Sequence, residues 1–137
     1  MKTVRIGLAG CGWIGTEHGR NILANPRAEL TGICDVDAER ARRFLQATGA
    51  RSRVFAEYAE LLKSDMDAIV IATPNAVHAD MAVAAAAAGK HIYCEKPMAI
   101  TLDDCRRVRA AVRRGGVKYL IGYHRRLNPL VQHARRL

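Results

Sequence analysis

The feature that most constrains the fold is a set of three glycines between an apolar segment and a helical one. Gly10, Gly12 and Gly15 have the spacing G-x-G-x-x-G. The preceding residues, 4–9, alternate apolar side chains with small or polar ones, which is typical of a β-strand. In such a turn the first glycine allows a tight reversal, the second lets the backbone approach a phosphate, and the third packs the helix on the strand. The sequence therefore predicts a strand–turn–helix unit whose helix N-terminus faces a phosphate.

An acidic residue at a fixed distance identifies the kind of phosphate ligand. Asp35 stands twenty residues beyond Gly15, at the end of a second apolar segment. A dinucleotide-binding fold places there the carboxylate that accepts hydrogen bonds from the adenosine ribose. We therefore expect a dinucleotide whose diphosphate lies on the turn formed by Gly10, Cys11, Gly12, Trp13, Ile14 and Gly15. The alternative is a purely structural turn with a surface aspartate.

The rest of the chain alternates strand-like and helix-like segments. Apolar patterns predict strands over 4–9, 29–34, 54–55, 68–72, 91–94 and 119–122. Between them, helices are expected over about 13–25, 38–48 with Asp37 as N-cap, 57–62, 77–88 and 101–115, and the tail from Asn128 begins like a helix. Ile14, Ile22 and Leu23 are expected to turn inward from the first helix. The alternation predicts an α/β fold with a doubly wound parallel sheet.

The bulk properties exclude several classes of protein. The 137 residues suit one domain, and with half of them hydrophobic a single core is expected. The longest apolar run, 81–88, is far below the roughly 18 residues that span a bilayer. The first strand begins so early that we expect no signal peptide and no membrane partner. The four cysteines have neither C-x-x-C nor zinc spacing, so we expect free thiols, a cytoplasmic location and no metal site.

Positive charge is concentrated in the last quarter of the chain. Residues 105–137 contain ten Lys or Arg and no acid, whereas the first 104 residues contain 12 basic and 13 acidic ones. This asymmetry can mark nucleic-acid binding, a solvated helix face or a surface covered by something acidic. Because the stretch has no recognisable reading module, we expect no nucleic-acid partner.

The residues that follow the second predicted strand also bear on the choice of coenzyme. Arg40, Arg42 and Arg43 follow Asp35 closely, and arginines there can hold the 2′-phosphate of NADP. Asp35 itself would repel that phosphate. The sequence therefore favours NAD over NADP.

Three further loops follow strands of the predicted sheet, where ligands bind. The first carries Thr73, Pro74, Asn75 and His78, the second Glu95, Lys96 and Pro97, and the third Tyr123, His124, Arg125 and Arg126. A lysine facing a coenzyme can orient a substrate hydroxyl or share its proton. On composition alone, a surface lysine paired with its neighbour Glu95 is the favoured interpretation of Lys96.

These motifs together carry a family resemblance. Thr73-Pro74-Asn75-x-x-His78, Glu95-Lys96-Pro97 and the run 122–126 with Pro129 follow the glycine turn in this order. The chain thus resembles the glucose–fructose oxidoreductase / inositol dehydrogenase (Gfo/Idh/MocA) family over nearly its whole length. The resemblance implies that Lys96 is the catalytic residue beside the nicotinamide, that the Lys96–Pro97 bond is cis, and that the coenzyme cleft is lined by Thr73, Pro74, Asn75, His78, Glu95 and Lys96.

The resemblance also implies a second domain that these residues do not contain. Relatives continue into an α/β substrate domain with an Asp-x-x-x-His pair, whose histidine acts as acid/base. We expect residues 1–122 to form the Rossmann domain and 123–137 to begin the connection to that absent domain. His124 and His133 lie in the wrong segments to replace the histidine, and His18 and His91 are expected to be partly buried contacts.

The functional expectation has two forms. The first is the coenzyme-binding part of an NAD-dependent oxidoreductase that takes a hydride from a secondary alcohol of a small sugar or polyol, with little turnover by this chain alone. The second is a non-catalytic NAD(H)-binding module or interaction subunit. Apolar surface left by an absent domain would favour self-association, and hence a homo-oligomer.

Overall fold

A single parallel sheet organises the molecule. The computed structural model describes residues 3–136. The strands are β1 (Val4–Ala9), β2 (Ala28–Cys34), β3 (Arg53–Phe55), β4 (Ala68–Ile71), β5 (His91–Cys94) and β6 (Tyr119–Ile121). They lie in the order β3-β2-β1-β4-β5-β6, and every neighbouring pair is parallel. This is the doubly wound Rossmann order, with the reversal between β1 and β4.

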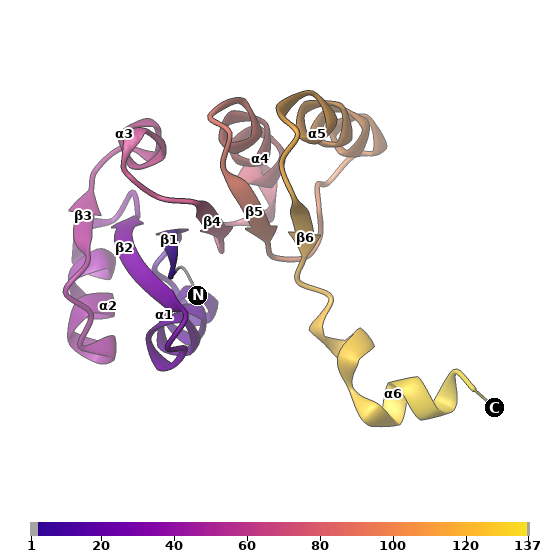
Figure 1. Cartoon of the computed structure of the whole chain (residues 1–137), viewed down its shortest axis with the longest axis horizontal. Coiled ribbons are helices and arrows are strands. Elements are labelled where there is room, and N and C mark those ends of the chain that lie inside the picture. The colour runs from indigo at the N-terminus through magenta and orange to yellow at the C-terminus, as the bar shows by residue number, and fades with distance from the viewer. Residues whose placement is uncertain (1–2, 137) are drawn as a thin grey trace.

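Helices connect the strands and cover both faces of the sheet. They are α1 (Trp13–Ala24), α2 (Ala38–Thr48), α3 (Tyr58–Lys63), α4 (His78–Ala87) after the 3-10 turn η1 (Asn75–Val77), and α5 (Leu102–Gly115). Figure 1 shows α1 and α2 on one face and α3, α4 and α5 on the other. After β6, η2 (His124–Leu127) and α6 (Pro129–Ala134) extend away from the sheet (Figure 1). The predicted elements are confirmed, with bounds that differ by one or two residues.

The core consists of two layers that the sheet separates. Along β4, Ile69 and Ile71 pack into the layer of α3, α4 and α5, whereas Val70 packs into the layer of α1 and α2. Successive side chains of a strand point to opposite faces, so a strand covered on both sides is apolar throughout. The run 68–71 therefore reads as continuous hydrophobic sequence because it lies in the middle of the fold.

One detail of the predicted core is wrong. Ile22 is buried and Ile14 partly so, but Leu23 is 44% exposed. The inward face of α1 is instead completed by Gly15 and Gly19. A side chain at Gly19 would overlap the ring of Phe44 on α2. The two helices thus approach closely through glycine, and no larger residue is needed on that face.

The predicted helix caps are confirmed. The Asp37 side chain accepts hydrogen bonds from the backbone N–H groups of Glu39 and Arg40, and Thr101 accepts one from Asp104. Each cap satisfies N–H groups that have no partner inside the helix. Within residues 3–136, no helix is both long enough and apolar enough to cross a membrane.

Candidate functional site

The glycine turn joins β1 to α1, and each of its three glycines stands where the backbone is close or the space is open. Gly10 has a φ of +93°, and a Cβ there would lie 2.5 Å from the carbonyl oxygen of Ala72. A Cβ on Gly15 would overlap the carbonyl oxygen of Gly10. Gly12, the N-cap of α1, has open space around its Cβ position and no side-chain cap. The first N–H groups of α1 therefore face an open space, as a phosphate site requires.

The Asp35 carboxylate is hydrogen-bonded to the backbone of this turn. Its Oδ2 accepts a hydrogen bond of 2.7 Å from the backbone N–H of Cys11, and Oδ1 accepts one of 2.9 Å from that of Asp37. The guanidinium of Arg40 donates to Oδ1 at 3.3 Å. The Asp35 side chain is only 4% exposed. Its charge is therefore compensated, and the residue lines a cavity.

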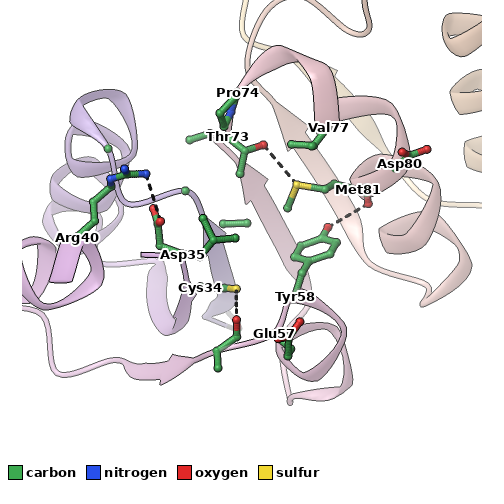
Figure 2. Close-up of a pocket in the computed structure, with 16 residues that line it drawn as sticks. Cys34, Asp35, Arg40, Glu57, Tyr58, Thr73, Pro74, Val77, Asp80 and Met81 are labelled. Atoms are coloured by element: carbon green, nitrogen blue, oxygen red, sulfur yellow. Dashed lines mark hydrogen bonds and ion pairs between the residues drawn. The ribbon is translucent and has the colours of Figure 1, made fainter. Parts of the chain in front are cut away.

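A cavity of about 780 Å³ opens at the carboxyl ends of the strands. Figure 2 shows Asp35 and Arg40 facing it from one side, and Thr73, Met81 and Tyr58 from the other. Its lining includes five of the predicted site residues, namely Gly10, Gly12, Asp35, Thr73 and Pro74. Tyr58 Oη donates to the carbonyl of Met81 at 3.0 Å, which fixes the wall formed by α3 and α4. The volume suits the adenosine part of a dinucleotide.

Sequence reasoning missed several wall residues. Val36, Glu57, Tyr58 and Met81 line the cavity but were not expected to. Glu57 and Tyr58 come two and three residues after the end of β3, so the rule that ligands bind at strand ends could have found them. The three-residue length of β3 hid this signal. Met81 lies one helical turn beyond His78, and its position depends on how α4 packs.

The loop after β4 turns its histidine inward. The His78 side chain is 0% exposed and is absent from the cavity lining. Its Nδ1 lies 2.8 Å from the carbonyl oxygen of Pro97 and its Nε2 lies 2.9 Å from that of Thr73. His78 therefore connects the loops after β4 and β5 from beneath, while Asn75 is exposed on the surface of its loop.

The loop after β5 also turns its acid inward. Glu95 is 7% exposed, and its Oε1 lies 2.9 Å from Nε2 of His18 on α1. The other oxygen, Oε2, accepts a hydrogen bond from the backbone N–H of Lys96 at 3.2 Å. Lys96 is exposed, and its ammonium has no ion-pair partner among residues 3–136. The alternative of a Lys96–Glu95 surface pair is therefore wrong, because Glu95 is committed to His18.

Two local expectations for this segment are confirmed. The Lys96–Pro97 peptide bond is cis. His18 is partly buried, with its ring edge against Tyr93 at a centroid distance of 5.0 Å.

The thiols near the site are held protonated. Burial, with the Asp35 carboxylate as a second cause, raises the pKa of the Cys11 thiol to about 12. Burial likewise raises the pKa of Cys94, directly before Glu95, to about 11. Since the thiolate is the reactive form, neither cysteine is a nucleophile near neutral pH. Within residues 3–136, no three His, Cys, Asp or Glu residues gather as metal ligands.

The third predicted loop forms a different surface. Tyr123, His124, Arg125 and Arg126 are exposed, and the Arg126 guanidinium lies 4.9 Å from the ring centroid of Tyr123. A second hollow of about 420 Å³ lies beside them, lined also by Leu120 and Tyr93. This surface is separate from the Asp35 cavity in its lining residues.

Comparison with known proteins gives a consistent result. The model of a family described as "Oxidoreductase family, NAD-binding Rossmann fold" (GFO_IDH_MocA) matches residues 4–123. The chain is 39% identical over 129 residues to the uncharacterized oxidoreductase YrbE of Bacillus subtilis, covering 93% of this chain and 38% of YrbE. It is 38% identical over 128 residues to inositol 2-dehydrogenase of Salmonella typhimurium, covering 90% of this chain and 38% of that enzyme.

A solved structure extends the likeness to three dimensions. The WlbA dehydrogenase of Bordetella pertussis, in complex with NADH and UDP-GlcNAcA, superposes with a TM-score of 0.89 at 36% identity. The alignment covers 96% of this chain and 38% of that one. The chain thus spans about 38% of the length of these relatives.

Proposed function

We propose, because the chain belongs to the oxidoreductase family with the NAD-binding Rossmann fold (Gfo/Idh/MocA), that it is the coenzyme-binding part of a dehydrogenase acting on a secondary alcohol of a sugar or polyol. The observation that carries this proposal is the joint geometry of the glycine turn and Asp35. A helix N-terminus without a side-chain cap lies at the same cavity as a buried carboxylate that is hydrogen-bonded to the turn at 2.7 Å. Residues of this kind fit a diphosphate and a ribose diol.

The roles of the individual residues follow from their chemistry. The N–H groups of the turn 10–15 bind the diphosphate, and Asp35 accepts hydrogen bonds from the adenosine ribose. Thr73, Pro74 and Asn75 line the coenzyme on the β4 side, with His78 and Glu95 supporting the two loops. NAD, when bound, supplies the hydride acceptor.

Lys96 is the residue that we assign to the chemistry. Its exposed ammonium lies at the carboxyl end of β5 and has no competing carboxylate among residues 3–136. An ammonium of this kind donates a hydrogen bond to the substrate hydroxyl oxygen and stabilises it while the proton leaves. Lys96 therefore orients the alcohol for hydride transfer.

The substrate class is drawn from the relatives. Inositol 2-dehydrogenase of Salmonella typhimurium is named for a polyol, and the WlbA dehydrogenase structure contains a nucleotide sugar. Both ligands carry secondary alcohols on a ring. A cyclic polyol or a sugar is thus the substrate class that we propose.

The other expected partners follow from composition and exposure. Residues 123–136 lie away from the sheet, and we propose that they begin the connection to a substrate domain. A cytoplasmic location accords with the four cysteines being free thiols. Apolar side chains exposed at Leu120 and Leu127 favour a homo-oligomer, to be tested by light scattering.

We propose no nucleic-acid partner for the basic last quarter. On α5, Arg106 pairs with Asp103, and Arg107 pairs with both Asp80 and Asp104. These ion pairs use part of the charge within the fold. DNA affinity that falls steeply with salt would contradict this assignment.

Coenzyme binding provides the first test. Trp13, the single tryptophan, is 80% exposed within the turn, so energy transfer to bound NADH reports binding at the proposed place. We expect the 137-residue chain to bind NADH and Gly12→Ala to weaken it at least tenfold, because the new methyl fills the space left for phosphate. A Cβ at position 12 meets nothing within 4 Å, so the melting temperature of Gly12→Ala should fall only by the small cost of alanine at an N-cap. An unaltered NADH affinity in Gly12→Ala would overturn the proposal.

Turnover provides the second test. We expect the chain to oxidise a panel of polyols and sugars poorly by itself, because the loss of one acid/base group costs about two to four powers of ten. Fast turnover would show that these residues hold a complete active site. Binding without turnover in any longer form of the protein would favour the non-catalytic module.

A further inference from the structure

The lysine of the Glu-Lys-Pro segment lies between two residues that are each held by a histidine. Glu95, on one side of Lys96, is held by His18 of α1 at 2.9 Å. Pro97, on the other side, presents its carbonyl oxygen 2.8 Å from Nδ1 of His78 at the start of α4. The two histidines come from different helices on opposite faces of the sheet.

Both oxygens of the Glu95 carboxylate are in contact with neighbouring groups. His18 contacts Oε1, and a Cβ on Gly122 at the end of β6 would lie 3.0 Å from the same oxygen. The second oxygen accepts the N–H of Lys96 itself at 3.2 Å. The Glu95 carboxylate therefore links the His18 ring to the backbone N–H of Lys96.

His78 acts on the other side of Lys96. Both of its ring nitrogens face carbonyl oxygens, of Pro97 at 2.8 Å and of Thr73 at 2.9 Å. Each contact is a hydrogen bond only when that nitrogen carries the hydrogen. Because His78 is completely buried, no water competes for either contact.

We propose that His18 and His78 are positioning residues for Lys96, which fix the backbone on its two sides so that its unpaired ammonium is directed to the nicotinamide end of the coenzyme. The inference rests on the proposed function of Lys96. The ammonium has no ion-pair partner among residues 3–136, so the position of the backbone that carries the side chain sets the region that the ammonium can reach. Neither histidine touches the reacting atoms.

The charge of the nicotinamide gives a readout that is independent of turnover. The ring is cationic in NAD⁺ and neutral in NADH, so a nearby ammonium disfavours NAD⁺ relative to NADH. Lys96→Met should lower the preference for NADH over NAD⁺ by about threefold to tenfold, the size expected for a partly solvated pair of unit charges. ADP-ribose has no nicotinamide, and its affinity should stay the same.

The His18 variants test the first contact. His18→Leu should lower the same preference by about twofold to fivefold, whereas His18→Gln should retain it, because the Gln amide nitrogen takes the place of Nε2 as donor to Glu95. In a Lys96→Met background, His18→Leu should have no further effect on the ratio, since effects that act through one group are not additive. His133→Gln, at an exposed site on α6, is the control.

The His78 variants test the second contact. His78→Asn keeps a donor at the position of Nδ1, toward Pro97, and His78→Gln keeps one at the position of Nε2, toward Thr73. Both remove the ring, so their melting temperatures should fall together. Only His78→Gln should lower the NADH preference. Equal effects of the two on the ratio would overturn the part assigned to His78.

The outcomes separate this inference from the proposed function. A wild-type chain that binds neither NADH nor ADP-ribose contradicts the proposed function. A wild-type chain that binds both, with a ratio that responds to Lys96→Met but not to His18→Leu, overturns the positioning role. An effect of His18→Leu that persists in full in the Lys96→Met background also overturns it.

Discussion

The loop after β1 and the loop after β5 lie on the same edge of the sheet but are constructed in opposite ways. The turn 10–15 depends on its backbone. At Gly10 and Gly15 other backbone atoms come so close that a side chain would not fit. The segment 95–97 is built from side chains that reach it from other helices, His18 and His78. Backbone recognition suits a phosphate, which every dinucleotide shares, and side-chain support suits a reacting group, which needs one orientation.

The two loops also differ in how they compensate an acid. Asp35 is satisfied by two backbone N–H groups and by Arg40. Glu95 is satisfied by one backbone N–H group and by His18. Both carboxylates are shielded from solvent, but Arg40, the partner of Asp35, is about half exposed, whereas His18, the partner of Glu95, is partly buried.

The largest expected effect comes from Gly15→Ala. Within a helix this change normally gains about 1 kcal/mol, but here the methyl overlaps the carbonyl oxygen of Gly10. We expect the free energy of unfolding to fall by about 1–3 kcal/mol, as for other overpacked sites, with loss of measurable NADH binding. Urea unfolding and NADH titration measure both. Lys96→Met in the other loop should leave stability unchanged, and an equal loss of stability there would break the comparison.

Asp35→Asn should have the next largest effect. The amide nitrogen of the substituted side chain would face a donor, either the N–H of Cys11 or the guanidinium of Arg40, so one buried hydrogen bond is lost. We expect NADH affinity to fall about tenfold to a hundredfold, from the cost of about 1–3 kcal/mol for an unsatisfied buried group. Asp37→Asn is the control, because asparagine is an equally good N-cap and residue 37 does not line the cavity. Similar losses in both variants would count against the role of Asp35.

The buried thiols predict a loss of stability at alkaline pH. Burial raises the pKa of Cys11 to about 12 and that of Cys94 to about 11, from 9.0. The unfolded chain therefore loses these protons first, so the stability is complete below pH 9 and is lost as the pH rises through 11 for Cys94 and 12 for Cys11. We expect about 1 kcal/mol per pH unit for each thiol.

Alanine variants of the two cysteines show which thiol causes the loss of stability. Between about pH 9 and 11 both Cys11→Ala and Cys94→Ala should flatten the dependence of the unfolding free energy on pH. Between about pH 11 and 12 only Cys11→Ala should do so. If the unfolding free energies of the two variants depended on pH in the same way over the whole range, the predicted difference between Cys11 and Cys94 would be wrong.

Arg40→Gln should have the smallest effect. Its guanidinium is about half exposed and lies 3.3 Å from Asp35, so the pair contributes no more than about 1 kcal/mol. We expect stability and NADH affinity to change little, while any weak NADPH binding falls a few fold because a cation near the ribose is lost. Titration with both coenzymes measures this. A large loss of NADH affinity would mean that Arg40 contacts the coenzyme directly.

The amino-acid sequence by itself determined the fold class, the six strands and the glycine turn. These features depend on local spacing and periodicity, such as the positions of Gly10, Gly12 and Gly15 or the apolar run of β4, and local patterns are readable without coordinates. Asp35 could also be placed, because one βαβ unit fixes its distance from the turn.

Only the tertiary structure decided what each side chain touches. On composition alone, the sequence favoured a surface pair between Lys96 and its neighbour Glu95, and that interpretation was wrong. The fold resolved this by bringing His18 to Glu95 from 77 residues away. In the same way, His78 was expected in the cleft and lies beneath it, with its two ring nitrogens facing the carbonyl oxygens of Pro97 and Thr73. The physical reason is that a hydrogen bond depends on distance and burial, and for residues far apart in the chain both are set only when the helices pack on the sheet.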